Sequence, residues 1–307
     1  MNDHAEETLA LSPHELIAGL RTLPSLPATY FRVKSLIDDA DAPLTAVERE
    51  MSADAAMTSR LLHLANSVLY ALRGRLESIG NALAILGLDQ VKHLVLVTSV
   101  TAAFRDISPE LMDMKRFWFA NLMRALLARG IAKQDGRIDA DRAFTEGLLG
   151  DIGHLVMYMG IPRLAERALV HARETGEPLH RVEWELIGFD YAEVGAELLS
   201  TWNFSEAMET VVRHHPEPLA AGGNAAVEAS ILHIATHFAE AALNGEPLEE
   251  WTRKVDSVIW LEAGLSVEGL EEIQSQAEEE LTGLAQGLFP EMSMAHVPAR
   301  LRRSATN

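Results

Sequence analysis

Helix start and stop signals recur along almost the whole chain, and they constrain the fold more than any other feature. Ser12-Pro13-His14-Glu15 is a capping box with proline at the first helical position, and Thr45-Ala46-Val47-Glu48 has the same pattern. Met57, Leu61 and Ala65 recur at helical spacing. No stretch alternates polar and apolar residues between turn signals as a strand would. The sequence therefore predicts an all-α protein.

Individual helices can be placed from these signals. Ser78 caps a short helix that Gly87 ends, and Asp89 begins an apolar helix that continues to about Phe104. We expect a loop over 216–224, a long helix over 226–243 and shorter acidic helices from there to about Leu288. The helices expected between these two parts cover 109–133, 139–159, 162–175, 179–187, 190–201 and 205–215.

The chain is expected to form two packed helical units and an extension. An N-terminal helical subdomain covers 13–106, and a second helical subdomain covers 107–243. An acidic helical C-terminal extension then covers 244–290, and 291–307 form a flexible tail. No fixed-period repeat is present, which argues against an α-solenoid.

Composition excludes several classes of function. A formal net charge of -19 argues against a broad binding surface for nucleic acid or an anionic membrane, because both require clustered Lys and Arg. The chain has no cysteine, so disulfides, thiolate metal sites and cysteine nucleophiles are excluded. The acidic N-terminus lacks the apolar core of a secretory signal. We predict a soluble, cytoplasmic protein with neither nucleic-acid nor membrane partners.

The run Gly147–Leu155 resembles the Gly-Leu-Leu-His-Asp-Ile-Gly-Lys signature of HD-superfamily phosphohydrolases, with Gly150 in place of the histidine. The chain from Leu23 to Pro216, and with less similarity to Ala242, also resembles HDOD domains (HD-related output domains). The segments that carry this resemblance, in the family order, are Leu23–Pro27, Ala65–Ser67, Ala84–Asp89, Phe117-Trp118, Ala143–Leu149, Gly188–Gly195, Trp202 and His214-His215.

The resemblance implies an N-terminal helical bundle packed on an HD-like helical bundle, followed here by the helical extension. HDOD proteins are bacterial and largely non-enzymatic, and they occur alone or beside signalling domains, including those of cyclic-di-GMP metabolism. The family positions expected to be structural are Asn66, Ser67, Gly87, Trp118, Gly150, Asp151 and Gly195.

A catalytic HD site needs histidines and carboxylates that converge on one or two metal ions. By the resemblance, four of the expected ligand positions fall on Ala120, Gly150, Tyr191 and Thr236, none of which matches the family ligand. The residual site positions are Asp151, His154, His214, His215 and His233. We therefore expect no catalytic residues, no bound metal and no cofactor.

Each residual position also has a structural interpretation, which we favour. Asp151 accepts hydrogen bonds inside the bundle, with His154 one turn later as a candidate partner. His214 and His215 are placed to cap the C-terminal end of a helix. His233 and His237 share a helix face, and we expect that face to be solvated rather than metal-binding.

The remaining motif residues are assigned to packing. Asn66-Ser67 is expected to form a structural bracket between the two halves. Trp118, Trp184 and Trp202 are expected to anchor the core.

These observations predict a non-catalytic signalling or regulatory protein that acts by binding other proteins. A link to cyclic-di-GMP signalling is what the resemblance implies. Two alternatives remain open: a divergent metal-dependent phosphohydrolase using Asp151, His214 and His215, and a sensor that binds a nucleotide in the former active-site cavity. The sequence leaves open the partner, the oligomeric state and whether the extension packs on its own chain.

Overall fold

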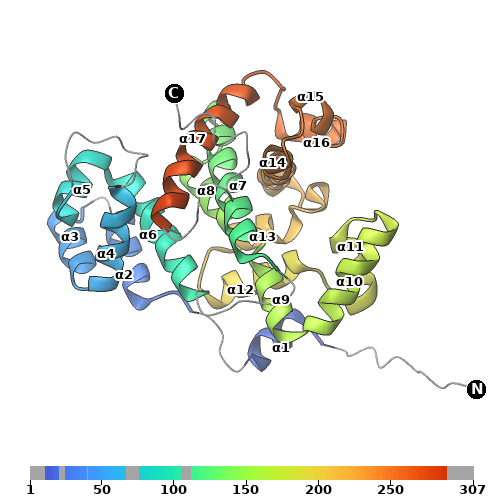
Figure 1. Ribbon diagram of the computed structural model, residues 1–307, viewed down its shortest axis with the longest axis horizontal. Helices are drawn as coiled ribbons and strands as arrows, with labels where there is room; N and C mark the ends of the chain where they lie inside the picture. Colours follow the sequence, from blue (N-terminus) through green and yellow to red (C-terminus); the bar gives the residue numbers. More distant parts are fainter. Residues whose placement is uncertain (1–10, 21–24, 40, 67–75, 105–111, 289–307) are drawn as a thin grey trace, which may run out of the picture.

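The computed structural model describes residues 11–20, 25–39, 41–66, 76–104 and 112–288, and these residues form helices joined by turns, with no strand among them (Figure 1). The predicted all-α fold class is confirmed. None of the helices in these ranges combines the length and apolar character needed to cross a bilayer. Apolar side chains from α1 through α17 contribute to one contiguous buried cluster.

The N-terminal bundle consists of α2–α6, which pack on one another. Figure 1 shows this bundle to one side of the molecule. Its helices are α2 (Ala28–Asp38), α3 (Leu44–Ser52), α4 (Ala55–Ala65), α5 (Ile79–Leu86) and α6 (Leu88–Ala103).

The second bundle is built around α7 (Met114–Asp135), which packs on α8, α14 and α17. Buried residues lie on every side of α7, as expected for a helix at the centre of a domain. The other helices of this bundle are α8 (Ala140–Leu149), α9 (Ile152–Gly160), α10 (Pro162–Thr175), α11 (Leu179–Ile187), α12 (Tyr191–Thr201), α13 (Glu206–His214) and α14 (Gly223–Asn244), with a short 3-10 helix, η2, over Pro218–Ala220.

The first helix, α1 (Pro13–Gly19), packs on α9 and α12 of the second bundle. Figure 1 shows it at the foot of α9, away from α2–α5. The predicted capping box at its start is confirmed, because Ser12 Oγ accepts from the Glu15 backbone N–H and the Glu15 carboxylate accepts from the Ser12 N–H.

Other predicted caps have mixed outcomes. Ser78 caps α5, and Gly87 ends it with a φ of 82°, as predicted. At the start of α4, Asp54 accepts from the Met57 N–H at 2.9 Å. The predicted capping box at Thr45 is wrong, because α3 begins at Leu44 behind Pro43 and has no side-chain cap.

The predicted continuous helix over 139–159 is also wrong, because it divides into α8 and α9 at Gly150-Asp151. Glycine is a weak helix former, and the break allows Asp151 to pair with a cation on α7. Helix α9 then crosses α12 at close range. A Cβ atom on Gly153 would lie 1.9 Å from the Tyr191 carbonyl oxygen and 2.6 Å from the Gly195 nitrogen.

The C-terminal extension packs on the same chain. Short helices α15 (Leu248–Trp251) and α16 (Ser257–Ala263) lie against α14, and α17 (Leu270–Leu288) contacts both α7 and α4. Helix α17 therefore bridges the two bundles. Arg129 on α7 donates to Glu280 on α17 at 2.5 Å. One 19-residue helix at 270–288 replaces the shorter helices expected there, because its buried face is held by packing on both bundles.

We expect Gly153→Ala to destabilise the protein by about 3 kcal/mol or more, because the added methyl group meets backbone atoms of α12 that cannot move without separating two helices. Gly19→Ala is the matched control, since a Cβ atom there has open space around it. Urea denaturation followed by circular dichroism measures both. Equal midpoints for the two variants would contradict the close crossing of α9 and α12.

Candidate functional site

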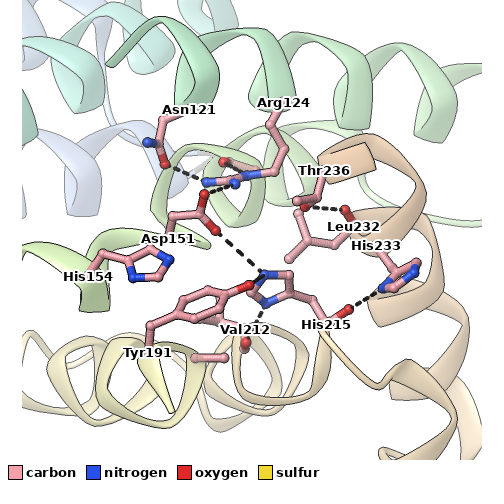
Figure 2. A network of polar contacts seen from close by, with 12 residues as sticks. Asn121, Arg124, Asp151, His154, Tyr191, Val212, His215, Leu232, His233 and Thr236 are labelled. Atoms are coloured by element: carbon pink, nitrogen blue, oxygen red, sulfur yellow. Dashed lines mark hydrogen bonds and ion pairs between the residues drawn. The ribbon is translucent and has the colours of Figure 1, made fainter. Parts of the chain in front are cut away.

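Asp151 lies at the α8–α9 break and faces Arg124 on the central helix α7 (Figure 2). Arg124 Nη1 is 2.5 Å from Asp151 Oδ2, and the arginine is 1% exposed. The other guanidinium donors are also used, because Nε donates to the Gly147 carbonyl at 2.7 Å and Nη2 donates to Asn121 Oδ1 at 2.5 Å. The carboxylate of the HD-like signature is therefore held by a built-in cation.

Gly150 makes room for this cation. A Cβ atom at Gly150 would lie 3.3 Å from Arg124 Nε and 3.4 Å from Arg124 Cζ. A histidine at this position would extend further toward the guanidinium and collide with it unless one of the two side chains moved. The glycine and the arginine are thus complementary in shape. Together they place a guanidinium where the signature would have a metal-binding histidine.

The charge of Asp151 follows from the same contact. Burial raises the pKa of the Asp151 carboxyl, but the Arg124 guanidinium and His215 outweigh burial and hold that pKa well below its usual range. Asp151 is therefore ionised at neutral pH. Its stabilising contribution is present above the pKa of an unfolded aspartate and is lost only as the pH falls far below it.

His215 and Tyr191 form the next layer of the network (Figure 2). His215 Nδ1 donates to the Val212 carbonyl at 2.7 Å, which caps the last turn of α13. Its Nε2 lies 3.1 Å from the Tyr191 hydroxyl and 3.7 Å from Asp151 Oδ1. Tyr191, at the position where the family pattern has a histidine, therefore supplies a hydrogen bond to His215.

His154 and Glu183 are buried close to each other beside this network. Glu183 on α11 accepts from the Tyr191 backbone N–H at 3.0 Å, and its second oxygen lies 3.7 Å from His154 Nδ1. Burial raises the pKa of Glu183 to about 8 and lowers the pKa of His154 to about 4. Both groups are therefore mainly uncharged near neutral pH. His154 also stacks on Tyr191, with ring centroids 3.9 Å apart.

These residues do not fit the metal centre of a catalytic HD site. Gly150 has no ligand to offer, Asp151 is paired with a guanidinium, and His215 Nδ1 is used by a backbone carbonyl. Within the described ranges, no group of three or more histidine and acidic side chains could together hold a metal ion. Two or three ligands of this kind would leave an ion weakly held.

The remaining predicted site residues lie around the network. His214 is directed away from it and lines an outer hollow. His233 Nδ1 donates to the His215 carbonyl at 2.8 Å, and its ring centroid lies 4.6 Å from that of His237. The solvated stripe expected for these two histidines is present only in part, because both residues are half-buried and His233 is bonded inside the protein. Thr236, between them, donates to the Leu232 carbonyl at 2.9 Å.

The residues expected to have packing roles differ in their burial. Trp118 and Trp202 are each 3% exposed in the core, whereas Trp184 is 60% exposed, so its predicted role as a core anchor is wrong. The Asn66 side-chain amide bonds both backbone groups of Leu76. Its Oδ1 accepts from the Leu76 N–H at 2.6 Å, and its Nδ2 donates to the Leu76 carbonyl at 2.8 Å. This bracket joins α4 to the segment before α5, not one half of the protein to the other. Ser67 lies outside the described residues.

Sequence reasoning missed Arg124 and Glu183. Only Arg124 had a signal that could have been used. Arg124 is the one charged residue within Phe117–Ala128, an otherwise apolar run with a single asparagine, so it must be buried with a counter-ion. Glu183 follows Val182 on the buried face of α11, but its polar neighbours resemble those of an exposed helix.

The HDOD domain family model matches residues 23–218, which is more than half of the chain. The chain belongs to the HDOD domain family. An uncharacterized protein of Treponema pallidum (strain Nichols) is 25% identical to this HDOD protein over 195 residues, or 63% of the chain. The aligned region is 37% of that relative, so the chain spans well under two thirds of the relative's length.

Solved structures resemble this HDOD protein over most of its length. A protein of Shewanella amazonensis SB2B, provisionally named a phosphohydrolase, is 26% identical with a TM-score of 0.73, covering 89% of this chain and 97% of its own. An HDOD domain protein of unknown function from Geobacter sulfurreducens is 21% identical with a TM-score of 0.69, covering 94% of this chain and 95% of its own. The second likeness shows the fold alone. Both likenesses agree with the helical fold described above.

We expect Arg124→Met to destabilise this HDOD protein by about 3–5 kcal/mol, because it leaves the Asp151 carboxylate without its counter-charge. The double variant Arg124→Met with Asp151→Asn removes both charges and should recover part of this loss. Arg181→Met is the control, since the exposed pair of Arg181 with Glu217 should contribute under about 1 kcal/mol. A double variant less stable than Arg124→Met in urea denaturation would contradict the pairing.

We expect Glu183→Gln to remove a pH dependence of stability between about pH 4.5 and 8. Since the folded state binds this proton more tightly than the unfolded state, wild-type stability falls as the pH rises through that window. Glutamine keeps an acceptor for the Tyr191 N–H and does not titrate, so the variant should gain relative stability towards pH 8. The readout is the difference in unfolding free energy between variant and wild type at each pH.

Glu185→Gln, two residues later on the exposed side of α11, is the matched control. His154 has a lowered pKa, so it makes stability rise with pH between about 4 and 6.5, in the opposite sense to Glu183. Subtracting wild type from variant removes this contribution as long as His154 titrates alike in both. A difference that does not change with pH would contradict a neutral Glu183.

Proposed function

We propose that this HDOD protein is a non-catalytic regulatory protein of the bacterial cytoplasm that acts by binding other proteins in signal transduction. The observation that carries the proposal is the Arg124–Asp151 pair. The Arg124 guanidinium fills the space beside Gly150 and neutralises the carboxylate that a metal would need. In this proposal the helical bundles of the fold are kept, and the polar residues around Asp151 hold helices together instead of binding a metal.

The energetics support the same conclusion. Breaking a buried pair to free Asp151 for a metal would leave the Arg124 cation buried and uncompensated, which is unfavourable by several kcal/mol. An ion bound there would also have to displace the Arg124 side chain, since its three nitrogens are already bonded to Gly147, Asn121 and Asp151. Metal-assisted attack of water on a phosphate has no assembled site in these residues.

Protein binding is the better use of such a fold. Helical bundles present grooves and hollows between helices in which a partner's side chains or helices can dock. The partner class that we propose is signalling proteins, including those of cyclic-di-GMP metabolism, on the basis of the family alone. The net charge of -19 favours partners with basic surfaces over nucleic acids.

We expect the purified full chain to hold no stoichiometric metal after exposure to Mn²⁺, Fe²⁺ or Zn²⁺ and removal of excess ion, and to hydrolyse neither phosphomonoesters nor cyclic-di-GMP. Elemental analysis and phosphate or nucleotide release measure these outcomes. Stoichiometric metal with turnover that Asp151→Asn abolishes would overturn the proposal in favour of a divergent phosphohydrolase.

Binding of a nucleotide is tested separately by thermal shift with cyclic-di-GMP and nucleoside triphosphates. A saturable stabilisation lost in Arg124→Met but kept in Arg181→Met would favour the sensor alternative instead.

A further inference from the structure

A hollow of about 420 Å³ lies on the outer side of the polar network, between α11, the start of α12 and the end of α13. Its size is within the range of about 300–1,000 Å³ that is typical of ligand pockets. Trp184 lines it and is 60% exposed, although it is the largest apolar side chain in that region. An exposed tryptophan in a concavity is a common anchor of protein interfaces.

The hollow and the network share three pairs of consecutive residues. In Glu183-Trp184, Asp190-Tyr191 and His214-His215, one member belongs to the buried network and its neighbour lines the hollow. Figure 2 shows Tyr191 and His215 pointing into the network. The hydrogen bonds of the inner members therefore fix the positions of the outer ones. The residues that line the hollow are therefore anchored by buried hydrogen bonds on the inner side of the same helices.

The charges in the hollow favour a cationic ligand. Four carboxylates line it, from Glu185, Asp190, Glu193 and Glu217, against the guanidinium groups of Arg181 and Arg213. Glu217 is paired with Arg181 at 2.9 Å. Burial lowers the pKa values of His180 and His214, which therefore add little positive charge near neutral pH.

Some of these carboxylate oxygens are already used inside the protein. Asp190 Oδ1 accepts from two backbone N–H groups at the start of α12, and Glu193 Oε2 accepts from the Asp190 N–H. The second oxygen of each, together with the exposed Glu185 carboxylate, makes no hydrogen bond within the described residues. These acceptors lie in the same hollow as the exposed indole of Trp184.

We propose that this hollow binds an arginine side chain of a partner protein, with its guanidinium on the Trp184 indole and its N–H groups paired with the carboxylates of Glu185 and Glu193. An indole is the preferred aromatic partner of a cation, and a planar guanidinium can stack on the ring while it donates to carboxylates. This inference rests on the proposed function and names the partner's chemistry: a basic segment of a protein.

The test uses the full chain at 150 mM salt and a fluorescein-labelled peptide, Gly-Arg-Gly-Arg-Gly, with Gly-Glu-Gly-Glu-Gly as the acidic comparison. Wild type should bind the arginine peptide and not the acidic one. Trp184→Ala should weaken binding roughly fivefold or more. This variant leaves the net charge unchanged, so the loss cannot arise from long-range attraction to an acidic protein. Trp184→Phe should retain part of the affinity.

Two matched controls localise the effect. Leu261→Ala removes another strongly exposed apolar side chain, on α16, and should bind as wild type does. Glu185→Gln should weaken binding, whereas Glu250→Gln, the same charge change on α15, should have a smaller effect. Circular dichroism checks that each variant is folded, which we expect because the altered side chains are exposed.

Equal binding by wild type and Trp184→Ala would overturn the inference and leave the proposed function standing. Tighter binding of the acidic peptide, lost in Arg213→Gln, would also overturn it, because the hollow would then recognise anions. Metal-dependent hydrolysis by the wild type would instead overturn the proposed function, without changing the peptide result.

Discussion

The buried guanidinium of Arg124 is the interaction on which the rest of the second bundle depends. It lies on the central helix, where it bonds Asn121 of the same helix, and it joins this helix to α8 through the Gly147 carbonyl and to the α8–α9 break through Asp151. Burying an arginine is costly unless its donors are used and its charge is compensated. Both conditions are met here by a helix break that turns Asp151 inward and by a glycine that leaves space. Without either of them, the buried arginine would destabilise the folded protein.

The polar centre is organised in two layers around this pair. The inner layer holds Asp151, His215 and Tyr191, with Glu183 and His154 beside them. Tyr191 and His215 are hydrogen-bonded to each other, and Glu183 and His215 each bond a backbone group. The outer layer includes the sequence neighbours of Glu183, Tyr191 and His215, which line the hollow around Trp184. This arrangement is the structural basis of the binding role that we propose.

Much of the helical pattern could be read from local signals, because caps, glycines and apolar spacing act over one or two turns. Ser12, Ser78 and Gly87 begin or end helices where expected. The errors arise where packing overrides local preference. The apparent helix over 139–159 breaks because Asp151 pairs with a residue far away in sequence, and α17 is continuous because it packs on α7 and α4.

The candidate site was predicted in part. Gly150 and Tyr191 mark the change from the HD-like ligand pattern, whereas Asp151 is retained, and both points follow from the order of residues along the chain. Sequence spacing could not identify Asp151's partner, because His154 is near in sequence whereas Arg124 is near in space. Likewise, the amphipathic pattern of α11 gave no indication that Trp184 would be exposed and Glu183 buried.

By itself, the sequence determined the all-α class, the family and the absence of the expected ligand at Gly150, since these depend on residue type and local order. Only the tertiary structure decided which cation neutralises Asp151, that the extension packs on its own chain, and that Trp184 faces an acidic hollow. Those outcomes depend on which helix faces meet. Contacts between residues that are distant in the chain determine this, and no local pattern encodes them.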